Sequence, residues 1–268
     1  MLDTPGALTI AFQPIVDIHA GGIVGHEALS RITAGTFGGP LPWFTAARRT
    51  GLAVALETKA CIAALRSIPR IPEDQFISVN LSPEALMSDA VRGHLNAVDP
   101  ARVVLELTEE ADAPDLSTQT AHIDELRRRG MRLAIDDIGA GYSSISRILH
   151  LQPDFLKVDR GLVQGCATDP MRRYVLEVFA SLAQKQGGEV VAEGVEDRED
   201  LDVVHQIGIR YVQGYLLGRA KSQPAELTRE ERCCLDIIAD RPLVIELGAA
   251  AVPARLPAEP AEGRAAYR

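Results

Sequence analysis

Short apolar segments rich in β-branched residues alternate along the chain with longer segments of helical pattern. The apolar segments predict strands at 8–18, 22–32, 76–82, 103–109, 132–138, 154–160, 189–196 and 210–218. The segments between them predict helices at 44–68, from Pro83 onward, at 116–130, just after residue 139, at 169–187 and at 197–208. Repeated strand–helix units of this kind indicate a parallel sheet that is covered by helices.

Local signals add detail to this pattern. The first two strands are joined only by residues 20–22, so they should pair antiparallel. Pro83 follows Ser82 at the expected start of a helix, and Gly130 is placed to end the helix at 116–130. Eight strands with about six helices between them fit an α/β barrel better than an open sheet, which stays the alternative at this level.

The C-terminal part of the chain differs in composition. Residues 224–238 predict one more helix, and residues 243–247 form a short apolar run. Residues 249–268 are rich in Ala and Pro, which predicts a disordered tail. We therefore expect one large domain over residues 1–245 and a tail over residues 246–268.

Composition and charge exclude several classes of protein. The chain contains no apolar run of about 18 residues, which argues against a transmembrane helix. Its N-terminus carries Asp3 and lacks a basic segment, unlike a secretory signal. Four cysteines without CxxC spacing indicate reduced, buried thiols, so we expect a cytoplasmic protein without membrane insertion. The net charge of −9 argues against binding to duplex nucleic acid.

Polar residues stand where apolar ones are expected, because they interrupt or end the predicted strands. Every strand except the first contributes: Glu27, Asn80, Glu106, Asp136, Asp137, Lys157, Glu193 and Gln213. The carboxyl ends of parallel strands meet on one face, and buried charges there are costly unless they are paired or metal-bound. A salt bridge at the rim would explain any one of these residues. Eight such residues at the same end of successive strands are hard to explain in this way.

The residue types limit the chemistry of this face. Carboxylates and a carboxamide are hard oxygen donors, which suit Mg²⁺ or Mn²⁺. Adjacent Asp136 and Asp137 can each serve one of two ions or bridge them, and such a pair, about 3.5–4 Å apart, is typical of phosphoester hydrolysis. Lys157 has two compatible interpretations: a salt bridge that holds the carboxylates together, or a group that orients or deprotonates the attacking water.

Other features are less informative. The segment 139–144 follows the two aspartates, and it is either a simple turn or a mobile loop that shapes the site. His26 precedes Glu27 without a second histidine at ligand spacing, so we interpret it as a packing or solvent-facing residue. The sequence shows neither a Ser–His–Asp arrangement nor a phosphate-binding glycine loop.

Seven sequence blocks, in order, resemble the EAL-domain cyclic di-GMP phosphodiesterases. The Glu27–Ala28–Leu29 tripeptide lies within FQPIVDI…GHEALSR, and SVNLS, LELTE, DDIGAGYSS, DFLKVD, VAEGVE and QGYLLG follow, so the resemblance covers roughly residues 8–220. It implies a TIM-like (β/α)₈ barrel with an antiparallel first strand. It also implies hydrolysis of one phosphodiester of cyclic di-GMP to linear 5′-pGpG, two Mg²⁺ or Mn²⁺ ions as cofactors, and a homodimer.

The resemblance also assigns roles residue by residue. It implies that Glu27, Asn80, Glu106, Asp136, Asp137 and Glu193 ligate metal, and that Lys157 holds the nucleophilic water. Gln13, Arg31, Asp159 and Gln213 match positions that contact the substrate or adjoin the metals. Glu109 and Glu196 match glutamates that anchor the loop after the two aspartates or support the metal site.

The chain departs from the family pattern in that loop. Ile138 and Ala140 stand where the family usually has Phe and Thr, which puts the rate and its regulation in question. The chain lacks a Gly-Gly-Asp-Glu-Phe synthase block and a sensor domain, so regulation is expected from the tail, a partner protein or another chain. Two alternatives are a cyclic di-GMP receptor without catalysis and a protein-interaction domain, and the complete set of ligand residues favours the enzyme over both.

Overall fold

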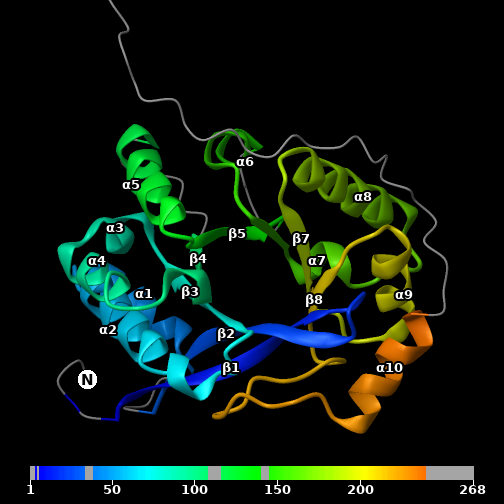
Figure 1. Ribbon diagram of the computed structural model, residues 1–268, viewed down its shortest axis with the longest axis horizontal. Helices are drawn as coiled ribbons and strands as arrows, with labels where there is room; N and C mark the ends of the chain where they lie inside the picture. Colours follow the sequence, from blue (N-terminus) through cyan, green and yellow to red (C-terminus); the bar gives the residue numbers. More distant parts are fainter. Residues whose placement is uncertain (1–3, 5, 34–38, 108–115, 140–144, 240–268) are drawn as a thin grey trace, which may run out of the picture.

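The computed structural model describes residues 4, 6–33, 39–107, 116–139 and 145–239. Eight strands form a closed barrel in chain order (Figure 1). Their bounds are β1 (Leu8–Asp17), β2 (Gly22–Ile32), β3 (Phe76–Leu81), β4 (Val103–Leu107), β5 (Arg132–Ile138), β6 (Phe155–Val158), β7 (Glu189–Glu193) and β8 (Tyr211–Gln213). β1 is antiparallel to both of its neighbours, β2 and β8, and all other pairs are parallel. The predicted TIM-like barrel with an antiparallel first strand is confirmed.

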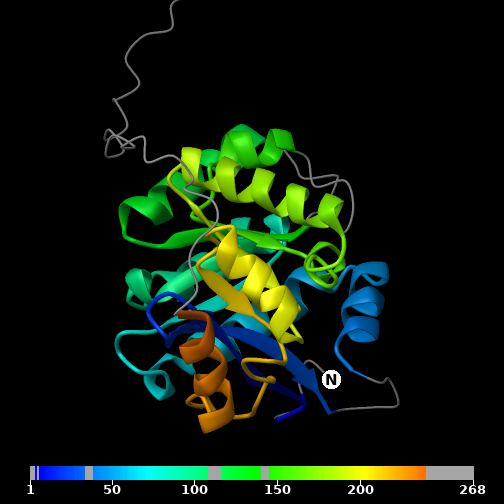
Figure 2. The same cartoon turned by 90° about the vertical axis from the view of Figure 1, so that its right-hand side faces the viewer.

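Helices surround the barrel. They are α1 (Leu41–Arg49), α2 (Ala53–Leu65), α3 (Pro83–Met87), α4 (Asp89–Leu95), α5 (Leu116–Arg128), α6 (Ile145–Leu151), α7 (Arg160–Val163), α8 (Pro170–Lys185), α9 (Arg198–Gln206) and α10 (Arg229–Ala239), with short 3₁₀ turns at Ile68–Arg70 and Pro100–Arg102. The last of them, α10, packs beside α9 on the outside of the barrel (Figure 2). No helix in the described part of the chain is long and apolar enough to cross a bilayer.

Backbone signals explain where the helices begin and end. The single helix expected at 44–68 is two helices, because Gly51 adopts a φ of 72° after α1 and the chain restarts at Ala53. The Ser82 side chain accepts a hydrogen bond from the Ala85 N–H and caps α3, as the Ser-Pro pair predicted. Gly130, at φ 95°, ends α5 in a Schellman motif in which Met131 N–H donates to the Leu126 carbonyl.

Two layers fill the inside of the barrel. The lower layer is apolar and contains Ile15, Phe76, Val104, Ala134, Phe155 and Val191. Residues two positions apart on a strand point to the same face, so the inward residue above Val104 is Glu106, and the one above Phe155 is Lys157. Asp136 and Glu193 follow Ala134 and Val191 in the same way. The polar face predicted from the strand ends is therefore a layer that rests on an apolar floor.

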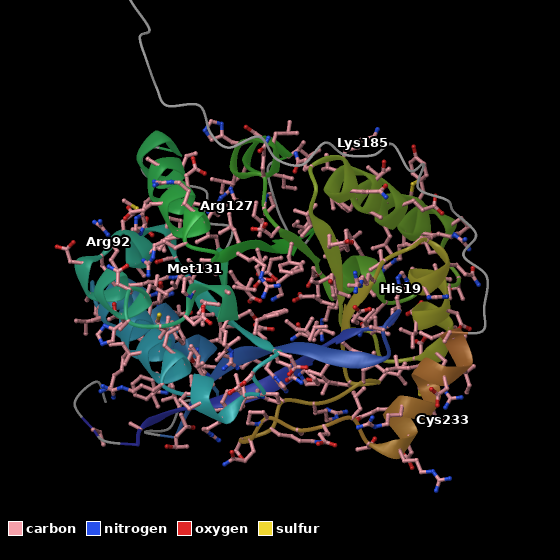
Figure 3. The ribbon with its side chains drawn as sticks, viewed as in Figure 1. His19, Arg92, Arg127, Met131, Lys185 and Cys233 are labelled. Carbon is pink, nitrogen blue, oxygen red and sulfur yellow. The ribbon has the colours of Figure 1, made fainter. Side chains whose placement is uncertain are left out.

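The predictions for the C-terminal part and the cysteines have mixed outcomes. The expected helix at 224–238 is present but shorter at its start, as α10. Residues 243–247 and the proposed tail lie outside the described residues. Cys61, Cys166 and Cys234 are buried free thiols as expected, whereas Cys233 is exposed on the outer side of α10 (Figure 3), so the prediction of burial was wrong for that residue.

Candidate active site

Lys157 lies at the centre of the polar layer. Its ammonium group is 2.8 Å from Glu193 Oε1 and 2.9 Å from both Glu106 Oε2 and Asp136 Oδ1. Glu27 Oε2 is slightly farther away, at 3.5 Å. The Lys157 side chain is only 2% exposed and the Glu106 side chain 1%. Lys157 thus forms salt bridges, the first of the two interpretations of this residue, to four carboxylates from four different strands.

Two carboxamides fix the orientation of Glu27. Asn80 Nδ2 donates to Glu27 Oε1 at 2.9 Å, and Gln213 Nε2 donates to Glu27 Oε2 at 2.6 Å. Burial alone would raise the pKa of Glu27, but the attraction of Lys157 and these amide hydrogen bonds outweigh it and lower the pKa. Glu27 is therefore a fixed carboxylate at the middle of β2.

The remaining acidic groups carry more negative charge than Lys157 balances. Burial, with the charges of Glu27 and Asp136, raises the pKa of Glu106 well above its usual value. Burial and Asp136 also raise the pKa of Glu193, to about 8. The pKa of Asp137 is raised by the same two causes. Carboxylates that are withdrawn from water and share a single cation favour an additional positive charge.

A β-bulge places the two adjacent aspartates at the same site. The register between β5 and β6 shifts between Ile135 and Ile138, and Asp137 adopts a φ of 57°, in the left-handed region. On a regular strand, adjacent side chains would point to opposite faces. Here carboxylate oxygens of Asp136, Asp137 and Glu193 lie within 4.8 Å of one another. This spacing and these hard donors fit a divalent cation.

Two cavities meet at Asp136 and Asp137. The first, about 270 Å³, is polar, and its lining includes Gln13, Glu27, Lys157, Asp159, Arg160, Glu193, Glu196, Gln213 and Tyr215. The second, about 320 Å³, is largely apolar, and its lining includes Leu29, Arg31, Phe44, Arg48, Glu57, Asn80 and Leu81. The two aspartates therefore stand between two compartments, one on each side.

The predicted substrate-contacting residues divide between these cavities. Gln13, Asp159 and Gln213 line the polar cavity, together with Glu196, whereas Arg31 lines the apolar one. Asp159 also caps α7, because its Oδ1 accepts a hydrogen bond from Gly161 N–H at 2.8 Å. The predicted loop anchor Glu109 lies outside the described residues, as do Ala140 and residues 141–144 of the expected loop.

Sequence reasoning missed several lining residues. Arg160 directly follows the DFLKVD block and Tyr215 lies within the QGYLLG block, so their sequence positions could have indicated them. Glu57 is a different case: it lies on α2, is buried, and its Oε2 accepts a hydrogen bond from Ser82 N–H at 2.9 Å. The local sequence around Glu57 gives no signal of this contact, because α2 reaches the cavity only through packing against the barrel.

His26 has a packing role, one of the two roles predicted for it. Its ring is 1% exposed and lies edge-on to Phe12, with 6.4 Å between the ring centroids. Burial lowers the pKa of His26 to about 4, although the backbone of Ala225 partly opposes this shift. The imidazole is therefore neutral at pH 7 and belongs to the outer packing of β2 rather than to the metal-ligand set.

Comparison with known protein families and curated proteins gives a consistent picture. A family model described as EAL domain matches residues 4–220. A probable cyclic di-GMP phosphodiesterase of Escherichia coli, PdeA, is 34% identical over 148 residues, which make up 53% of this chain and 20% of that protein. The chain covers less than half the length of the first three curated relatives: 20%, 31% and 42%.

Solved structures share the same architecture. The PaMucR phosphodiesterase, solved as a c-di-GMP complex, has a TM-score of 0.71 at 30% identity and covers 80% of this chain and 92% of that one. Klebsiella pneumoniae BlrP1, solved as a manganese and cyclic di-GMP complex, has a TM-score of 0.74 at 30% identity. That match covers 84% of this chain and 59% of BlrP1.

The central position of Lys157 leads to a stability prediction. Lys157→Met keeps the aliphatic volume but removes the cation that pairs with the four carboxylates around it, so the metal-free protein should lose about 3–5 kcal/mol of unfolding free energy. Urea denaturation in EDTA measures this loss. The control is Lys185→Met at the exposed end of α8 (Figure 3), which should change stability by less than about 0.5 kcal/mol. Equal stability of the two variants would contradict the central role of Lys157.

Proposed function

Since the chain belongs to the EAL domain family, we propose that it is a metal-dependent phosphodiesterase. It hydrolyses one phosphodiester bond of cyclic di-GMP and releases linear 5′-pGpG. The observation that carries this proposal is the convergence of five carboxylates and two carboxamides around one buried lysine, between two cavities.

The donor set fits two Mg²⁺ or Mn²⁺ ions. All the side chains that would hold them end in oxygen donors: Glu27, Asn80, Glu106, Asp136, Asp137 and Glu193. Two divalent cations would balance the formal charge of these five carboxylates and Lys157. When bound, such a pair lowers the pKa of a coordinated water and stabilises the oxyanions of the phosphate. Asp137 is the exposed member of the set, so it is best placed to serve the second ion.

The protein's own side chains would do the rest of the work. Lys157 holds Glu106, Asp136 and Glu193 at 2.8–2.9 Å, which fixes the ligands before substrate arrives. The same ammonium group is proposed to orient the attacking water. Gln213 keeps Glu27 in place through its hydrogen bond. Catalytic roles are thus assigned to Glu27, Asp137, Lys157 and Glu193.

The shape of the site suits a substrate with two similar halves. A cyclic dinucleotide would place its scissile phosphate at Asp136 and Asp137 and extend one half into each cavity. Gln13 and Asp159 would then contact the nucleotide in the polar cavity, and Arg31 would contact a phosphate oxygen from the apolar side. Glu196, and by resemblance Glu109, would support the metal site.

A homodimer is the second part of the proposal. Large apolar side chains are exposed on α6 (Ile145, Leu149) and on α8 (Met171, Tyr174, Val178), with exposed fractions between 47% and 67%. These helices follow neighbouring strands and lie on the same side of the barrel (Figure 1). A second copy of the chain would cover this face. Because α6 follows the segment after Asp137, dimer formation would be linked to the metal site, and a separate sensor protein could act there.

An activity assay tests the enzyme proposal. Purified protein with Mg²⁺ or Mn²⁺ should convert cyclic di-GMP to pGpG, separated by chromatography, and EDTA should abolish the product. Glu27→Ala should lose turnover because it removes a fixed ligand, while its circular dichroism spectrum stays unchanged. The matched control is Glu230→Ala at the exposed start of α10, which should keep full activity.

The other outcomes identify the alternatives. Binding of cyclic di-GMP without turnover would indicate a receptor, and absence of binding would indicate a protein-interaction domain. A fully active Glu27→Ala variant would contradict the assignment of the site.

Light scattering coupled to size-exclusion chromatography tests the dimer. We expect the wild-type chain at about twice its monomer mass, and Tyr174→Asp should shift it to the monomer by placing a charge in an apolar interface. Ile237→Asp, at an exposed apolar position on α10, is the control and should remain dimeric. A monomeric wild type, or dissociation caused by Ile237→Asp instead, would refute the proposed face.

A further inference from the structure

An aromatic–cation pair stands at the rim of the polar cavity, and the site described so far does not use it. Tyr215 lines the cavity and is 49% exposed. The guanidinium carbon of Arg219 lies 3.8 Å from the centroid of the Tyr215 ring. This is close contact for a cation over an aromatic face, so Arg219 holds the ring in one orientation.

The backbone at Tyr215 is also fixed. Gly214, just before it, passes so close to the chain after β7 that an added Cβ would lie 2.0 Å from the Val195 carbonyl oxygen. Leu216 N–H donates to that same carbonyl at 3.2 Å, and Leu217 is buried at 1% exposure. The side chain of Tyr215 therefore extends from a tight turn that is anchored on both sides.

The surroundings select the kind of group that would contact the ring. Asp159 and Glu196 line the same cavity together with Arg160, and a phosphate offers no N–H group to these two carboxylates. A nucleobase, in contrast, offers a flat π-face for stacking and N–H groups that can donate hydrogen bonds to carboxylates. Arg219 lies over one face of the ring, so a planar ligand would have to stack on the opposite face.

We propose that Tyr215 stacks against one guanine base of the substrate and that Arg219 is the positioning residue that holds the ring in place. This inference rests on the proposed function and deepens it, because it names a residue that decides how tightly the base is bound. The stacking interaction has the same strength in the ground state and in the transition state, so it should lower KM without raising kcat.

Kinetic measurements with cyclic di-GMP test the proposal. Tyr215→Ala should raise KM roughly tenfold, as expected for loss of one base–aromatic stack, with kcat within about twofold of wild type. Tyr215→Phe should behave like wild type, because only the ring face is used. Arg219→Ala should raise KM by a smaller factor, and Arg219→Lys should recover part of that loss by restoring the cation. Ile237→Ala, an exposed apolar truncation on α10, is the control and should change neither constant.

Each departure from this pattern has a defined meaning. An unchanged KM in Tyr215→Ala, with an active wild type, would overturn the stacking role and leave the proposed function standing. A Tyr215→Phe variant as impaired as Tyr215→Ala would assign the effect to the hydroxyl group and would also overturn it. A wild type that neither binds nor hydrolyses cyclic di-GMP would overturn the proposed function itself, and the stacking role with it.

Discussion

The ion-pair network around Lys157 is the interaction on which the rest of the structure depends. One ammonium group, buried at 2% exposure, contacts carboxylates from β2, β4, β5 and β7. Burying so many charges is unfavourable unless each is paired, and one cation does not balance four anions. The raised pKa values of Glu106 and Glu193 result from their burial together with that imbalance of charge. The protein can thus fold around this network, and the network still favours the binding of further positive charge.

The two-layer interior separates stability from chemistry. The apolar floor, which includes the stacked pair of Phe76 and Phe155, closes the barrel from below. The polar layer rests on it one strand repeat higher, so the ligands stand on rigid strands rather than on loops. Carboxylates held in this way need little rearrangement when a cation or a substrate arrives, which is the advantage of a preorganised site.

Much of this could be predicted from the sequence because the relevant signals are local. Alternation of strands and helices indicated the barrel, and the polar residues that interrupt or end the strands include every residue of the Lys157 network. Other features depend on tertiary context. The bulge that turns Asp137 toward Asp136 arises from a shift in pairing with β6, which has no signature in the sequence. Glu57 reaches its cavity through the packing of α2, and the break at Gly51 was hidden within a continuous helical pattern.

The overall acidity of the chain is concentrated in part in the polar layer of the barrel. A large share of the net charge of −9 comes from carboxylates gathered at one end of the barrel. Divalent cations bound there would allow an acidic protein to accept an anionic dinucleotide. The most direct test is anomalous diffraction from a crystal soaked in Mn²⁺. The account predicts two manganese peaks about 3.5–4 Å apart beside Asp136 and Asp137. An anomalous map without a peak at these aspartates would contradict it.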